Sequence, residues 1–225
     1  MDRLCPTLPA RTDEAQALRY MGHFGPADSG TLQLLHRAEQ ALRREARPLA
    51  VWHEYALTEL SLQDCGHDLA RHLQDCPRVV LMAATLGTGV DSLLRRLSLT
   101  DVAMAVAADA LASTIIEQVC DDVEASLRSH VEQQGRYLTG RYSPGYGDCP
   151  LHLQKHLCGC LDTGRKIGLT LTADGLMTPR KSVTAVLGVS ARPVKGYRAG
   201  CGQCLLKETC QYRKRGTTCA ENESI

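Results

Sequence analysis

The chain has 225 residues and a formal net charge of +1 at pH 7, a length that suits one large domain or one domain with a small appendage. Its apolar content of 44% excludes an intrinsically disordered chain. The near-neutral charge argues against a nucleic-acid-binding protein, which needs a basic surplus on one face. Aromatic residues make up only 4%, so aliphatic side chains must fill the core.

Hydrophobic periodicity predicts helices and one strand in the first part of the chain. Apolar residues recur at helical spacing over 30–46, and Pro48 ends that pattern. Shorter helices are predicted over 13–21 and 66–74, and a strand over 49–57.

The run 79-VVLMAATLGTGVDSLLRRL-97 predicts a buried strand, a turn at Gly87 and Gly89, and a helix. A strand, a glycine turn and a helix N-terminus can hold a phosphate. This run matches neither the dinucleotide-binding nor the P-loop pattern, so we interpret it as a tight strand-to-helix turn.

The longest predicted helix covers 100–131, with Thr100 and Asp101 as its N-terminal cap. Its most apolar part, 102–116, contains an aspartate and is shorter than a membrane span. The start of the chain lacks the apolar core of a signal peptide. We therefore expect a soluble, cytoplasmic protein without a membrane segment.

Glu117 lies where the Ala-rich half of this helix ends, beside Ile115 and Ile116. A carboxylate at the edge of an apolar surface is usually just solvated, but it is also a candidate site residue.

The stretch 141-RYSPGYGDCPLH-152 concentrates residues that suit ligand contact. Arg141 offers a rigid fork for a carboxylate or phosphate, and Pro144-Gly145 sets a turn that lets the backbone approach a ligand. Tyr146 adds a flat face and a hydroxyl. The residues alone leave a small-molecule site and a purely structural role equally open.

The remaining elements complete an α+β chain. A helix is predicted over 151–163, and strands over 169–172 and 183–190. We expect long helices packed on a mainly antiparallel, twisted sheet, with residues 1–200 as the α+β domain and 201–225 as a Cys-rich tail.

The pattern R-x-x-P-G-Y-x-x-C-P-x-H of residues 141–152 resembles the S-adenosylmethionine-binding motif of the reactivation domain of cobalamin-dependent methionine synthase. The likeness continues downstream through 169–190 and upstream in 110-ALASTIIE-117. The segment 79–101 is similar to free-standing bacterial proteins of the same superfamily. Two features depart from the family's pattern. The turn has the sequence GYGDCP, where GYPACP is commoner in the family. A ligand-binding Asp of that family has no counterpart that we can identify here.

The resemblance implies a protein that binds S-adenosylmethionine and presents its methyl group to reduced cobalamin on a partner. Arg141 would hold the ligand's carboxylate, and Glu117 would balance its positive charge. The other implied cofactor-binding residues are Pro144, Gly145, Tyr146, Cys149 and His152. The implied partners are a corrinoid-carrying methionine synthase, or a related corrinoid protein, and an electron donor such as flavodoxin or ferredoxin. The protein itself need not catalyse a reaction.

The tail carries four cysteines in a metal-ligand pattern, Cys201, Cys204, Cys210 and Cys219. Thiolate ligation suits an iron–sulfur cluster or zinc, whereas the alternative is a tail of reduced thiols. This cluster favours a second function, an iron–sulfur oxidoreductase that reduces corrinoid cobalt directly. A third function is a module that binds or delivers a corrinoid.

His152 and His156 stand one helical turn apart and could share a metal ion. The more ordinary interpretation is that both are helix residues without a ligand. Cys5, Cys65, Cys76 and Cys120 are interpreted as isolated thiols, with Cys120 buried on its helix.

Overall fold

The computed structural model describes residues 2–23, 25–60, 62, 64–194 and 196, together with 208, 209 and 214. The four cysteines of the predicted tail site, at positions 201, 204, 210 and 219, lie outside these residues.

The described part of the chain forms a five-stranded sheet in the order β1-β2-β3-β7-β4. All neighbouring strands in it are antiparallel, as the sequence predicted. Its strands are β1 (Asp2–Leu4), β2 (Leu49–Ala56), β3 (Arg78–Thr85), β4 (Tyr137–Leu138) and β7 (Ser182–Ser190). A separate hairpin pairs β5 (Thr170–Leu171) with β6 (Met177–Thr178). The very short strands β1, β4 and β6 were not predicted, because two or three residues carry no readable alternation.

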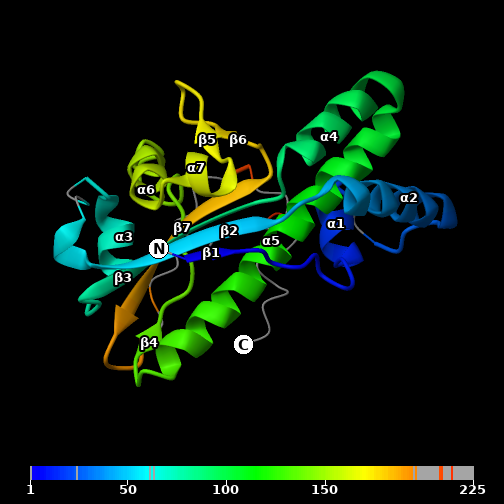
Figure 1. Cartoon of the computed structure of the whole chain (residues 1–225). Helices are drawn as coiled ribbons and strands as arrows, with labels where there is room; N and C mark the ends of the chain where they lie inside the picture. Colours follow the sequence, from blue (N-terminus) through cyan, green and yellow to red (C-terminus); the bar gives the residue numbers. More distant parts are fainter. Residues whose placement is uncertain are drawn as a thin grey trace.

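Helices cover both faces of the sheet (Figure 1). One face carries α1 (Glu14–Tyr20), α2 (Ser29–Glu45), α4 (Thr88–Thr100) and α5 (Val102–Glu132). The other carries α3 (Gly66–His72), α6 (Leu153–Leu161) and α7 (Thr163–Ile167), and a short turn of 3-10 helix (Leu57–Glu59) follows β2. The predicted helix over 151–163 is therefore two short helices, separated by Asp162 in a left-handed conformation.

Strand β3 explains why the fold has two cores. Val80, Met82 and Ala84 face the helices around α5, whereas Leu81 and Ala83 face α6 and α7. Successive side chains of a strand point to opposite faces, so a strand covered on both sides reads as an unbroken apolar run. Removing a large buried side chain here, as in Leu81→Ala, would cost about 2–5 kcal/mol.

The turn after β3 is the tight strand-to-helix connection that the sequence predicted. Gly87 has φ +85°, a conformation that favours glycine. A Cβ on Gly89 would lie 2.6 Å from the backbone oxygen of Glu45. Glycine is required there because α4 and α2 approach each other closely.

The boundary between α4 and α5 lies one residue later than predicted. The sequence predicted Thr100 and Asp101 together as the N-terminal cap of the long helix, whereas Asp101 alone is the cap. Thr100 is the last residue of α4, and Asp101 alone interrupts the helical path with φ −154° and ψ 91°. The Asp101 carboxylate accepts the backbone N–H of Met104 at 3.0 Å, which satisfies the start of α5.

By length and composition alone α5 is long and apolar enough to cross a membrane, with a mean hydropathy of 1.5 over its most apolar 18 residues. That window extends beyond the predicted apolar run 102–116, because the helix continues to Glu132. Half of that window is buried inside the fold, where it packs against α1, α2, α4 and the sheet. The same apolar composition is what a helix at the centre of a core requires.

Candidate functional site

The chain after β4 continues along the edge of β7. Thr139 donates its backbone N–H to Gly188 at 2.9 Å, and Tyr142 exchanges two backbone hydrogen bonds with Val186 at 2.9 and 2.8 Å. The alternation of an extended chain then sends Arg141 toward α5, whereas Tyr142 packs into the core beneath α3 and α6. Arg141 is thus placed by strand geometry rather than by a flexible loop.

Arg141 binds three carboxylates of α5. Its guanidinium lies 2.7 Å from Asp121, 3.0 Å from Glu124 and 3.5 Å from Glu117. These acids occupy neighbouring positions on one helical face, since residues three and four apart are adjacent on an α-helix. We call Arg141, Glu117, Asp121 and Glu124 the Arg141 cluster. The structure therefore brings the predicted pair Glu117 and Arg141 together, from positions 24 residues apart in the sequence.

The Arg141 side chain is only 16% exposed, so it lies deeper than the ligand-facing lip that the sequence suggested. Burial alone would lower the pKa of its guanidinium, but the Cys120 side chain and the carboxylates of Asp121 and Glu124 outweigh burial and raise that pKa. Arg141 therefore stays charged. The Glu117 side chain is 46% exposed, which makes it the more accessible of the two predicted ligand contacts.

Residues 143–149, which we call the motif turn, are fixed by α3. The Asp148 carboxylate accepts the backbone N–H groups of His67 and Asp68 at 2.7 and 2.9 Å, at the start of that helix. These two bonds lower the pKa of Asp148, and Asp148 is thereby an N-terminal cap supplied from a distant segment. This chain has GYGDCP where the family more commonly has GYPACP. The aspartate in this sequence, Asp148, therefore has a structural role as the cap of α3.

Two glycines give the motif turn its shape. Gly145 has φ +90° and Gly147 has φ +53°, which are strained conformations for other residues. The Tyr142 hydroxyl donates to the backbone oxygen of Tyr146 at 3.1 Å. The Tyr146 side chain is 69% exposed, whereas Cys149 is buried and burial raises its thiol pKa to about 11.

A groove of about 850 Å³ lies beside the N-terminal half of α5. Asp109 and Ser113 line it, and Glu117 follows one turn further along the same helical face. Lys181 donates to the Ser113 hydroxyl at 2.8 Å and pairs with the Asp109 carboxylate at 2.9 Å. Polar side chains thus form a continuous stripe on α5 from this groove to the Arg141 cluster.

The sequence pointed to Glu117 and Arg141 as candidate ligand contacts, but not to their neighbours Asp121, Glu124, Asp109 and Lys181. The spacing of the acids on one face of the helix was a readable signal. The pairing of that face with Arg141 and Lys181 was not readable, because it depends on how α5 crosses the sheet.

The remaining predicted site residues lie in two places. Pro144, Gly145, Tyr146 and Cys149 all belong to the motif turn. His152 instead lines an open surface depression with Lys155 and His156. Among the described residues, no three His, Cys, Asp or Glu side chains are grouped so that they could hold a metal ion. Cys120 is buried as predicted.

The fold and this site define a mixed α+β domain with a charged groove along its longest helix. A family model, described as the activation domain of vitamin B12-dependent methionine synthase, matches residues 54–216. The match covers most of the chain, so the protein belongs to that family.

A solved structure has a similar fold, the crystal structure of the MetH reactivation domain bound to AdoHcy. It superimposes with a TM-score of 0.59 at 14% sequence identity, over 97% of this chain and 90% of that one. This comparison supports the fold alone. A search among curated proteins found no match to this chain.

Proposed function

We propose that the protein binds S-adenosylmethionine and presents its methyl group to reduced cobalamin carried by a partner protein. Membership of the activation-domain family supports this proposal, as does the AdoHcy in the domain of similar fold. The observation that carries it furthest in this chain is the contact between Arg141 and Glu117, the two residues that the family resemblance of two separate segments singled out.

The charges of the Arg141 cluster suit such a ligand. S-adenosylmethionine carries a sulfonium and an ammonium beside one carboxylate. The exposed carboxylates of Glu117 and Asp121 face solvent on α5 and would attract the positive groups. Arg141 would bind the ligand's carboxylate or hold the two acids in place for the ligand.

The cofactors supply the chemistry of reactivation, and the protein supplies position and electrostatics. The exposed ring of Tyr146 offers flat, amphipathic contact area for a corrin edge. A corrinoid-carrying methionine synthase is the partner class that the family implies, with a flavodoxin or ferredoxin as the electron donor. The cytoplasmic location stays a prediction.

Calorimetric titration with S-adenosylmethionine tests the binding step. Arg141→Ala should weaken binding about 10–150-fold, the loss of a charge-assisted contact, and Glu117→Gln should weaken it while preserving side-chain size. Arg96→Ala is the matched control, because it removes an exposed ion pair with Glu45 on α2. Absence of heat at millimolar ligand in the wild type, or equal affinity in all four proteins, would contradict the proposed site.

An anaerobic assay tests the reactivation step. Oxidised corrinoid protein, a chemical reductant and S-adenosylmethionine are mixed with this chain, and methylcobalamin is followed by its absorbance. Tyr146→Ala should slow methylcobalamin formation more than it weakens ligand binding. Equal rates with and without the chain would favour corrinoid storage or delivery instead.

The iron–sulfur alternative rests on the tail. We propose that residues 201–225 bind one metal centre through Cys201, Cys204, Cys210 and Cys219, an inference from their spacing alone. The family match reaches residue 216 and so includes the first three of these cysteines. A visible absorbance band after anaerobic purification would indicate an iron–sulfur cluster, and zinc in a colourless sample would indicate a structural site. A metal content unchanged by Cys201→Ser and Cys204→Ser would refute the tail site.

A further inference from the structure

The groove beside the N-terminal half of α5 has an apolar lining that the core leaves uncovered. Tyr20, Val102 and Val106 line it with side chains that are 47%, 69% and 48% exposed. Only half of the most apolar 18-residue window of α5 is buried inside the fold. Large hydrophobic side chains that gather at one hollow of about 850 Å³ indicate an interaction surface, whereas exposed apolar residues scattered singly need no explanation.

Two neighbouring helices give this groove the shape of a helix-binding surface. Arg95 and Ser98 line it from α4, and the lining residues of α5 run from Val102 to Ser113, a length of about 16 Å along the helix. Figure 1 shows α4 beside the first turns of α5, at the opposite end of the molecule from β4. Short side chains in the lining, such as Ala105, allow another helix to approach to the roughly 8–10 Å at which helices pack.

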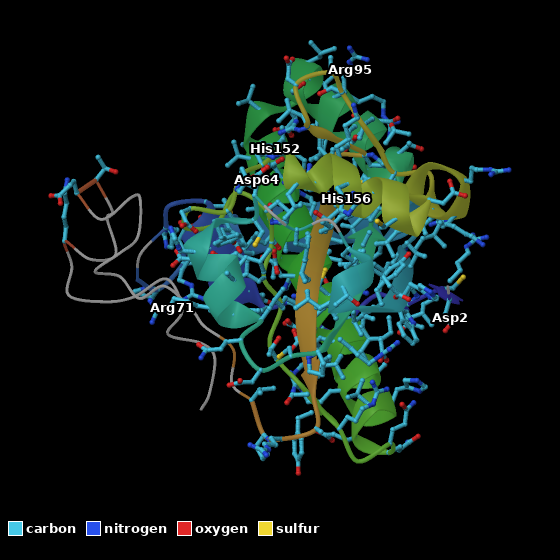
Figure 2. The ribbon with its side chains drawn as sticks, turned by 90° about the vertical axis from the view of Figure 1, so that its left-hand side faces the viewer. Asp2, Asp64, Arg71, Arg95, His152 and His156 are labelled. Carbon is cyan, nitrogen blue, oxygen red and sulfur yellow. The ribbon has the colours of Figure 1, made fainter. Side chains whose placement is uncertain are left out.

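Two arginines add positive charge to the apolar lining. Arg95 comes from α4 and Arg180 from the connection between β6 and β7, and neither guanidinium forms an ion pair with another described residue. Figure 2 shows Arg95 at this end of the molecule. The acids of the groove have other partners, because Asp91 accepts the backbone N–H of Arg180 at 2.9 Å and Asp109 pairs with Lys181 at 2.9 Å. A partner that fills the groove would therefore complement it best with carboxylates.

We propose that this groove binds an amphipathic helix of a partner protein, with aliphatic residues on one face and acidic residues beside them. The bound helix lies along α4 and α5 and buries Val102 and Val106, the usual mode of helix-in-groove recognition. Its carboxylates pair with Arg95 and Arg180 at the edge of the contact. A flat lipid surface does not fill a hollow between two helices, which favours a helix over a membrane as the occupant. The surface is distinct from the motif turn, and the inference does not rest on the proposed function.

Fluorescence anisotropy of two labelled peptides, titrated with the full chain, tests the proposal. Both peptides are helices of about 16 residues, roughly 24 Å long, with leucines along one face. One carries glutamates beside the leucines, and the other carries lysines at the same positions. The wild-type chain should bind the glutamate peptide about tenfold more tightly than the lysine peptide, and the double variant Arg95→Glu/Arg180→Glu should reverse that preference. Val106→Glu should weaken binding of the glutamate peptide about tenfold, because it places a like charge inside the apolar contact.

Leu176→Ser is the matched control, because it removes an exposed apolar side chain that does not line the groove. It should bind the glutamate peptide as the wild type does. Light scattering and sedimentation with phosphatidylcholine–phosphatidylglycerol vesicles examine the other occupants. The proposal is overturned by equal affinity for the two peptides, by no saturable binding at millimolar peptide, or by equal losses in Leu176→Ser and Val106→Glu. A dimer, or an association with vesicles, that forms in the wild type and is abolished by Val106→Glu would also overturn it.

Discussion

Replacing Arg141 by methionine should destabilise the fold as well as the site. Methionine keeps the length of the side chain but leaves Glu117, Asp121 and Glu124 without their shared cation. Removing one partner of a fully buried ion pair costs about 3–5 kcal/mol. The Asp121 side chain is 67% exposed and Glu117 is 46% exposed, so solvent screens part of this loss. We therefore expect about 2–3 kcal/mol, or a fall in Tm of roughly 4–12 °C for a chain of this length.

Urea unfolding followed by circular dichroism measures this loss. The double variant Arg141→Met/Glu124→Gln should lose less than the sum of the single variants, because it also removes an uncompensated carboxylate. Arg96→Met, in an exposed ion pair, is the control and should be near neutral. A change of less than about 0.5 kcal/mol in Arg141→Met, or simple additivity in the double variant, would refute the role of Arg141 as the shared counter-ion.

Three further outcomes are expected. Gly147→Ala should cost about 1–3 kcal/mol in the free energy of unfolding and weaken ligand binding, because a Cβ would overlap the Asp68 carboxylate at φ +53°; unchanged urea unfolding would contradict this. Cys120, whose thiol pKa burial raises to about 12, should resist alkylation at about pH 8 until the protein unfolds, whereas exposed Cys5 reacts; equal labelling by mass spectrometry would refute it. Glu54→Gln should cost about 1–2 kcal/mol near neutral pH. Burial alone would raise the pKa of Glu54, but Arg136 and Arg78 outweigh it and hold the pKa below its usual 4.5. The stabilisation is therefore present above about pH 4.5 and disappears as the pH falls through the lowered pKa; a difference that stays constant from neutral pH down to the acid unfolding of both proteins would contradict this.

Local patterns in the sequence were enough to predict the long elements and the motif. The apolar run of β3, the Gly87 turn and the periodicity of α2 each depend on residues that are neighbours in the chain, and all three were predicted. The motif turn was also readable, because its proline and glycines act on their own backbone. Glu117 and Arg141 were found through the resemblance of two short segments to one family, whose model indeed matches the chain.

The tertiary structure alone decided how these pieces meet. Arg141 reaches Asp121 and Glu124 because the edge of β7 holds the extended chain against α5. Asp148 caps α3 across 80 residues of sequence, and no local rule pairs such distant groups. Periodicity indicates which face of an element is buried, but it does not indicate which element covers that face. The partners of each polar side chain in the site follow from that packing.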